Sequence, residues 1–207
     1  MKPEAVIFDI GNVLLRWDPE GFYDREIGET RRRALFAETG LMEVNDEIDA
    51  GAPFRASIEE LAARHPAWAA EIMMWHDRWH DLASPPITGA IRLRDTLRAK
   101  GIPVFALTNF GDGSWDHALL RYGFLADFDR LYISGRLKLV KPDPALYAHV
   151  EADCGIAPDR LLFADDRADN IAAAARRGWR THQVESWEGL ARRLVAEDLL
   201  TEAEAGL

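Results

Sequence analysis

The sequence has almost no cysteine, and it lacks any apolar run long enough to cross a membrane. Cys154 is the single cysteine, so no disulfide can form within the chain, and a reducing compartment is expected. The apolar run at residues 5–8 is too short for a signal peptide, and Asp9 interrupts it. These absences predict a soluble cytoplasmic protein with no membrane partner.

Basic residues are fewer than acidic residues. The chain has 25 Lys and Arg against 35 Asp and Glu, which gives a formal net charge of -10 at pH 7. Nucleic acids and anionic membrane surfaces attract basic protein surfaces, so the charge argues against both as partners. The length of 207 residues, 48% of them hydrophobic, suits one globular domain with a small insertion.

Short runs with strand character recur along the chain. Nearly continuous apolar runs of this length are typical of strands that are buried on both faces of a sheet. The runs are residues 5–8, 103–107, 131–133, 161–164 and 181–184.

Amphipathic helical patterns separate these runs. They cover residues 89–99, 143–153 and 168–177, and the last of them stops at Gly178, a favourable residue for a helix C-terminus. Strands that alternate with helices need crossover connections, which produce a parallel sheet covered on both faces. The predicted fold is therefore α/β, with a doubly wound parallel sheet.

Residues 16–86 break this alternation, because they contain several helical patterns and no convincing buried strand. Ser57 and Glu60 have the spacing of a capping box and predict a helix that starts at Ser57. A further helix is expected over residues 68–82. The stretch is interpreted as an all-helical insertion after the first strand.

The insertion divides the expected structure into two domains. Residues 1–15 and 87–207 form the α/β core, and residues 16–86 form a helical cap domain. The last residues of the core, 196–207, are expected to be a weakly anchored helix.

Polar residues follow the apolar runs. In an open parallel sheet, ligands bind where the strands have their C-terminal ends, so residues at these ends are expected to share one pocket. They are Asp9, Thr108, Asn109, Asp165 and Asp166, with Lys141 shortly after the third run.

These residue types suit the transfer of a phosphoryl group. Carboxylates are ligands for Mg²⁺, and the metal and Lys141 would neutralise the phosphoryl charge. Thr108 would hydrogen-bond the phosphoryl oxygens, and a carboxylate could attack phosphorus to form an acyl-phosphate. Each residue alone has an ordinary alternative: an aspartate after a strand is often a turn former or a helix cap, and Lys141 could be a solvated lysine before a helix.

The order of the motifs resembles that of the haloacid dehalogenase-like (HAD) hydrolase superfamily over nearly the whole chain. Four motifs carry the resemblance: residues 8–14 (FDIGNVL), 107–109 (LTN), 141–144 (KPDP) and 163–170 (FADDRADN). The helical insertion is similar to the small cap of the subgroup that places its cap after the first motif. The resemblance implies a Rossmann-like core.

The resemblance also implies roles for individual residues. Asp9 would be the nucleophile, and Lys141 would pair with it and with the phosphate. The implied substrate-binding residues are Asn12, Thr108, Asn109 and Lys141. The implied Mg²⁺ ligands are Asp9, Asp165, Asp166 and the backbone carbonyl of Gly11, with Asp169 close by or acting through water. The partner would be a small phosphorylated molecule; the sequence gives no oligomeric state.

One position departs from the commonest phosphatases of this superfamily. They have a second aspartate two residues after the nucleophile, which protonates the leaving group, and Gly11 stands there instead. The stretch from Asp9 to Val13 is familiar from bacterial phosphatases that act on glucose 1-phosphate. A sugar 1-phosphate has a relatively acidic leaving group, so it is the preferred substrate class. The acid could also come from the cap.

Several cap residues could serve the substrate. The candidate acids are Asp18, His76 and His80. His76 and His80 lie four residues apart, which is also metal-ligand spacing, although ordinary surface or interface histidines are commoner. The aromatic residues that could stack on a sugar ring are Trp17, Trp75 and Trp79, although aromatics at helical spacing are more often core.

Two other functions remain open. A 2-haloacid dehalogenase also lacks the second aspartate and uses an aspartate to attack carbon without a metal, but Asp165 and Asp166 have no purpose in that chemistry. A non-catalytic homologue that binds a phosphorylated ligand or a protein is the other alternative, and only the lost acid suggests it. A Mg²⁺-dependent phosphatase accounts for more of the residues.

Overall fold

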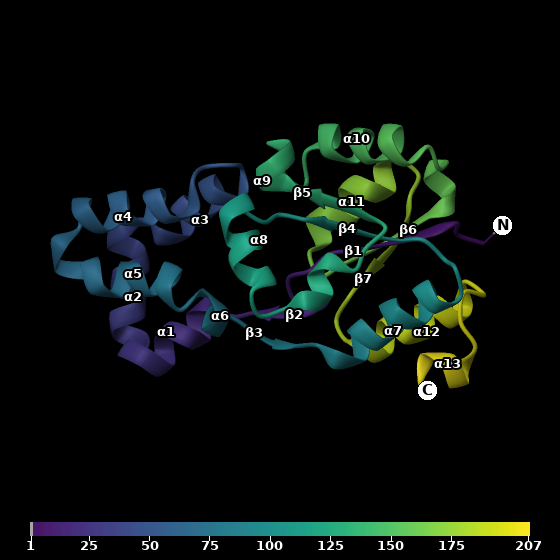
Figure 1. Ribbon diagram of the computed structural model, residues 1–207, viewed down its shortest axis with the longest axis horizontal. Helices are drawn as coiled ribbons and strands as arrows, with labels where there is room; N and C mark the ends of the chain where they lie inside the picture. The colour runs from purple at the N-terminus through teal and green to yellow at the C-terminus, as the bar shows by residue number, and fades with distance from the viewer. Residues whose placement is uncertain (1) are drawn as a thin grey trace.

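The computed structural model describes residues 2–207. Figure 1 shows a sheet with helices on both faces at one end of the molecule and a group of helices at the other end. The strands are β1 (Ala5–Phe8), β2 (Leu15–Trp17), β3 (Ala83–Pro86), β4 (Val104–Thr108), β5 (Arg130–Ile133), β6 (Leu161–Asp165) and β7 (Arg180–Gln183).

Helices connect the strands. They are α1 (Pro19–Ile27), α2 (Glu29–Thr39), α3 (Leu41–Asp49), α4 (Phe54–Arg64), α5 (Ala69–Asp77), α6 (Trp79–Leu82), α7 (Thr88–Ala99), α8 (Asp112–Leu119), α9 (Ser134–Leu137), α10 (Pro144–Cys154), α11 (Ala168–Arg176), α12 (Trp187–Ala196) and α13 (Glu202–Ala205). Among residues 2–207, no helix combines the length and the apolar composition that crossing a membrane requires.

The main sheet is parallel and has the strand order β5-β4-β1-β6-β7. The first strand lies in the middle, so that Ile7 is in register with Phe105 of β4 on one side and Phe163 of β6 on the other. The five predicted runs are these five strands, and the doubly wound α/β prediction is confirmed. This strand order places Asp9, the residue that follows β1, at the centre of the edge where the strands have their carboxyl ends.

Alternate residues of β1 belong to two separate apolar cores. Val6 and Phe8 pack with residues of α7 and α12 on one face of the sheet. Ala5 and Ile7 pack with residues of α10 and α11 on the other face. All four are fully buried, and burial of a side chain such as Val or Phe contributes roughly 1.5–3 kcal/mol. Burial on both faces is why the strand is continuously apolar in sequence.

A second, two-stranded sheet joins the helical region to the core. Strands β2 and β3 pair antiparallel, with Leu15 opposite Pro86 and Trp17 opposite Ala83, and helices α1 to α6 lie between them in the chain. The sequence analysis found no strand in residues 16–86, so this ribbon corrects it. Its strands are short and one ends in two prolines, which hides the usual strand pattern.

Two other local predictions are wrong. Helix α4 begins at Phe54, directly after Pro53, so Ser57 lies inside the helix and does not cap it. The C-terminal segment is firmly anchored, because Leu199 and Leu200 are buried in the core and α13 carries a complete capping box between Thr201 and Glu204.

Candidate active site

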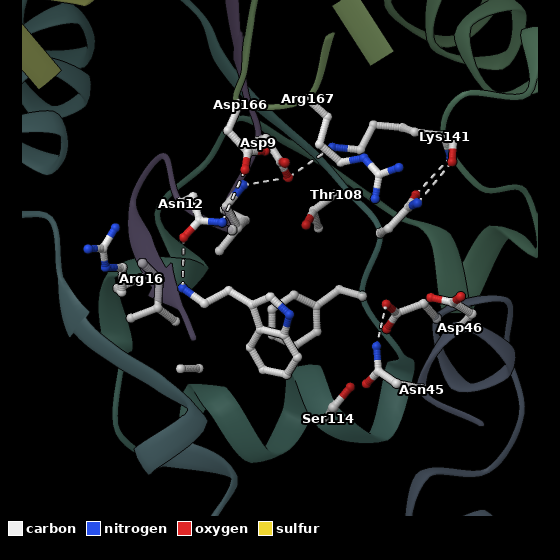
Figure 2. Close-up of a pocket in the computed structure, with 18 of the residues that line it drawn as sticks. Asp9, Asn12, Arg16, Asn45, Asp46, Thr108, Ser114, Lys141, Asp166 and Arg167 are labelled. Atoms are coloured by element: carbon white, nitrogen blue, oxygen red, sulfur yellow. Dashed lines mark hydrogen bonds and ion pairs between the residues drawn. The ribbon is translucent and has the colours of Figure 1, made fainter. Parts of the chain in front are cut away.

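A cavity of about 360 Å³ opens at the carboxyl edge of the sheet. Residues that follow β1, β4 and β6 line one side of it, and residues of α3, α6, β2 and β3 line the other. Figure 2 shows Asp9, Asp166 and Lys141 on the sheet side and Asn45, Asp46 and Ser114 on the opposite side. The residues predicted from the strand ends therefore share one pocket, except that Asp165 is buried beside it and does not line it.

Asp9 is almost completely buried at the end of β1. Its Oδ1 accepts a hydrogen bond from the backbone N–H of Ile10 at 2.7 Å and lies 2.9 Å from Nζ of Lys141. Burial raises the pKa of the Asp9 carboxyl to about 7; Lys141 opposes this shift, and the charges of Asp165 and Asp166 add to it. Within residues 2–207, Oδ2 of Asp9 accepts no hydrogen bond.

Lys141 is buried at the centre of the site, and its ammonium group has three partners. Nζ lies 2.9 Å from Oδ1 of Asp9 and 2.7 Å from Oδ2 of Asp165, and it donates to the backbone carbonyl of Leu107 at 3.0 Å. Burial by itself would lower the pKa of Lys141, but Asp9 and Asp165 outweigh it and hold the pKa above its ordinary value. The lysine therefore stays charged.

Asp165 is fully buried at the end of β6 and is held by several donors. Besides Lys141, the side chain of Asn170 donates to both of its oxygens at 3.0 Å, and the backbone N–H of Arg167 donates to Oδ1 at 2.8 Å. Asp166 is oriented by Asn12, whose Nδ2 donates to Oδ2 at 3.0 Å. Both carboxylates are fixed by the surrounding chain.

The acidic residues form a group that suits a divalent cation. One oxygen from each of Asp9, Asp165 and Asp166 lies within 4.8 Å of the others. Three carboxylates outnumber the single charge of Lys141, and oxygen donors at this spacing fit a hard cation such as Mg²⁺. Gly11 also lines the cavity. Asp169 is not part of the group; it pairs with Arg167 at 2.8 Å.

Thr108 and Asn109 follow β4 but differ in what their side chains do. The buried Thr108 hydroxyl points into the cavity between Asp9 and Lys141 (Figure 2). Asn109 lines the cavity, but its Nδ2 donates to the carbonyl of Lys141 at 3.0 Å and its Oδ1 accepts from the N–H of Lys141 at 2.7 Å. The amide of Asn109 therefore positions the lysine loop, a role the sequence analysis did not assign.

The expected cap acids lie outside the cavity. Asp18 caps α1 by accepting from the N–H of Gly21 at 2.9 Å. The helix over residues 68–82 is broken at Arg78, and His76 and His80 both contact the ring of His117, away from the cavity lining.

The three tryptophans of the helical region divide between the cavity and the core. Trp17 and Trp79 line the cavity, with ring centroids 6.1 Å apart. Trp75 is fully buried, and its ring packs edge-on against Trp17 at 5.7 Å.

The structure also brings forward residues that the sequence analysis missed. Asn170 is the last residue of the fourth motif, but the sequence analysis gave it no role. Its place in that motif could have marked it as a site residue. The others are on the helices that face the sheet edge, where no local pattern marks a pocket residue. They are Asn45, Asp46 and Asp49 on α3 and Ser114 on α8.

Comparisons with known proteins agree with this fold. A family model described as haloacid dehalogenase-like hydrolase matches residues 3–178. The chain is 24% identical to a sesquiterpene phosphatase of Aspergillus oryzae over 173 residues, 83% of this chain and 84% of that protein. It is 24% identical to a drimenol cyclase of Aspergillus calidoustus over 185 residues, 86% of this chain, and spans about a third (33%) of that protein.

Solved structures of similar shape include both a phosphate complex and a dehalogenase. A HAD family enzyme of Bacteroides thetaiotaomicron, in complex with magnesium and inorganic phosphate, has a TM-score of 0.66 at 22% identity, covering 91% of this chain and 98% of that chain. L-2-haloacid dehalogenase of Xanthobacter autotrophicus has a TM-score of 0.62 at 20% identity, covering 98% and 86%. These likenesses show the fold.

Proposed function

Because this chain belongs to the haloacid dehalogenase-like hydrolases, we propose that it is a Mg²⁺-dependent phosphatase that acts on a small phosphorylated metabolite through an aspartyl-phosphate at Asp9. One observation carries the proposal: Asp9, Lys141 and Asp166 line a single cavity, and the buried Asp165 lies directly beside them. A nucleophile, a buried cation and a carboxylate pair for a metal are the groups that this chemistry needs.

The site residues have complementary tasks in the proposed reaction. The Asp9 carboxylate attacks phosphorus, and the bond from phosphorus to the leaving oxygen breaks. Lys141 and the Thr108 hydroxyl hold the phosphoryl oxygens as negative charge shifts toward the leaving group. Asp9, Asp165, Asp166 and the Gly11 carbonyl would hold Mg²⁺, which would neutralise negative charge on the phosphoryl group. Water then cleaves the aspartyl-phosphate, releasing inorganic phosphate and regenerating Asp9.

The helices α1 to α6 are proposed to be the cap that selects the substrate. Their side of the cavity presents the aromatic rings of Trp17 and Trp79 beside the polar side chains of Asn45 and Asp46, a combination that suits a sugar ring as well as a larger apolar group. A sugar phosphate is the proposed class, and the sesquiterpene phosphatase relative supports phosphate-ester hydrolysis in general. A cytoplasmic location is part of the proposal.

A 2-haloacid dehalogenase is the second candidate, and the observation that favours it is Gly11, which leaves no carboxylate two residues after the nucleophile. The dehalogenase among the similar folds adds to this case. Asp166 weighs against it, because its partly buried carboxylate faces the pocket, and a second carboxylate there would repel an anionic substrate. The phosphatase gives a task to Asp9, Lys141, Asp165 and Asp166.

An assay of both products separates the two functions. Phosphate release from p-nitrophenyl phosphate is measured with Mg²⁺ and with EDTA, beside halide release from 2-chloropropionate. The phosphatase is expected to release phosphate only with Mg²⁺ and no chloride. Chloride release that is insensitive to EDTA would instead identify a dehalogenase. A panel of sugar phosphates and isoprenoid phosphates under the same conditions then defines the substrate class.

A further inference from the structure

Asp49 is a carboxylate in the cavity to which the proposed reaction assigns no task. It is the last residue of α3, and it lines the same cavity as Asp9. Its Oδ2 accepts a hydrogen bond from Nδ2 of Asn45 at 3.2 Å, and the backbone of Gly111 also hydrogen-bonds to its carboxylate. In Figure 2, Asn45 lies across the cavity from Asp9 and from Asp166.

The position of Asp49 is fixed by the core rather than by its own helix alone. Its backbone carbonyl accepts a hydrogen bond from Oγ of the fully buried Ser134 at 2.6 Å. Gly111 approaches so closely that a Cβ at that position would lie 2.5 Å from Cγ2 of Ile48. The end of α3 is therefore clamped against the loop that follows β4, with the carboxyl group held at the cavity wall.

The surroundings of Asp49 favour its protonated form. Burial raises the pKa of its carboxyl to about 7. The hydrogen bonds from Gly111 and Asn45 lower this pKa, and the negative charges of Asp46 and Asp9 raise it.

Three basic side chains on the helices packed against α3 have carboxylate partners of their own. Arg32 of α2 pairs with Asp24, Arg55 of α4 pairs with Glu59, and Arg136 of α9 pairs with Asp112, whereas Lys138, after α9, lies beside Gly51. An acid with a pKa near the working pH is suited to both donating and accepting a proton.

We propose that Asp49 is the general acid and base of this enzyme, supplied by the helical region in place of the carboxylate missing at Gly11. The inference rests on the proposed phosphatase function. In the first step, Asp9 attacks phosphorus, and the proton of Asp49 moves to the leaving oxygen, which departs as an alcohol. In the second step, Asp49 takes a proton from the water that attacks phosphorus, so that phosphate leaves and the acid is restored.

This role widens the range of substrates. A sugar 1-phosphate has an acidic leaving group and needs little help from an acid, whereas an ordinary alkyl phosphate needs a proton donor. With Asp49 as the donor, the enzyme is able to cleave phosphate esters of primary alcohols. Substrate choice then depends on the cavity wall and is not restricted by leaving-group acidity.

The test compares Asp49→Asn with Glu47→Gln, a matched loss of one carboxylate at an exposed position of the same helix, outside the cavity lining. Pre-steady-state formation of the phosphoenzyme is measured with p-nitrophenyl phosphate, whose leaving group needs no proton, and with a primary alkyl phosphate. Asp49→Asn is expected to slow phosphorylation by the alkyl phosphate about a hundredfold and leave that by p-nitrophenyl phosphate nearly unchanged. Glu47→Gln should spare both. Equal effects on the two substrates, or none, would overturn the inference.

A rescue variant distinguishes loss of the proton donor from loss of folding. A Cβ at Gly11 would have Cβ of Trp17 at 3.9 Å as its nearest neighbour, so the position has room for a side chain. Gly11→Asp combined with Asp49→Asn should restore turnover of the alkyl phosphate, and failure to restore it in a folded double variant counts against the role of Asp49. If the wild-type protein releases no phosphate from either substrate, the proposed function itself fails.

Discussion

Asn109 and Lys141 are joined by two reciprocal hydrogen bonds, in which the amide of Asn109 donates to the Lys141 carbonyl at 3.0 Å and accepts from the Lys141 N–H at 2.7 Å. Both bonds fix the backbone from which the buried ammonium reaches Asp9. Asn109→Ala is expected to lower kcat about tenfold to a hundredfold, because the ammonium shifts relative to the phosphoryl group.

The measurement for Asn109→Ala is kcat and KM on p-nitrophenyl phosphate, with thermal unfolding to follow stability. A positioning role predicts a loss mainly in kcat for protein that is still folded. A wild-type kcat would show that the lysine loop holds its place without this amide.

Asn12 combines an unusual backbone with a contact to Asp166. Its φ of 53° lies in the left-handed region, and its side chain bridges Asp166 and the N–H of Trp17. Asn12→Gly keeps the backbone conformation but frees Asp166, so Mg²⁺ affinity is expected to fall about tenfold or more. Asn12→Ala should lose the same affinity and also stability, by about 1 kcal/mol. Titration calorimetry measures the Mg²⁺ affinity of both variants, and chemical unfolding measures their stability. Equal stabilities would show that the left-handed backbone at this position carries no cost for Ala.

Asp166 and Asp169 provide a matched pair for the metal site. Asp166 belongs to the acidic group, whereas Asp169 pairs with Arg167 outside it. Asp166→Asn is expected to weaken Mg²⁺ binding more strongly than Asn12→Gly, and Asp169→Asn is expected to leave it close to wild type. Magnesium titrations of the three variants measure this order. If Asp169→Asn bound Mg²⁺ more weakly than Asp166→Asn, the metal site would lie closer to α11 than proposed.

Asp49 has a characteristic effect on the pH dependence of stability. Its pKa is about 7 in the folded protein and near the ordinary 3.8 when unfolded, so between these values the folded state binds more protons. The contribution of Asp49 to the free energy of unfolding therefore falls as pH rises from about 4 to 7.

Asp49→Asn removes this dependence. Relative to wild type, the variant should gain up to about 4 kcal/mol in unfolding free energy between pH 4 and pH 8, because a pKa shift of about three units is worth 1.36 kcal/mol per unit. Urea unfolding of both proteins across this range measures the difference. A constant difference between the two proteins would mean that Asp49 has an ordinary pKa in the folded state.

The parallel sheet could be predicted because its signals are local. Each central strand is buried on both faces, so it appears as an apolar run, and the residue after the run lies at the carboxyl edge. This rule placed Asp9, Thr108 and Asp166 in one cavity from sequence alone. The resemblance to a known family supplied the expected roles.

The helical region was harder because its features depend on packing. The ribbon of β2 and β3 has too few residues for a periodic pattern, and the helix start at Phe54 is set by Pro53 rather than by the capping-box spacing at Ser57. Asp49 has no local signal either. It reaches the cavity because α3 docks against Gly111 and Ser134, which lie more than 60 residues further along the chain.

The proposed function depends on phosphorylation of Asp9 during turnover. The most direct measurement is acid quenching of the enzyme during reaction with p-nitrophenyl phosphate and Mg²⁺, followed by peptide mass mapping. We predict one added phosphoryl group on the peptide that contains Asp9, and neither label nor turnover in Asp9→Asn. Phosphate release by a protein that carries no phosphoryl group on Asp9, or full activity of Asp9→Asn, would contradict it.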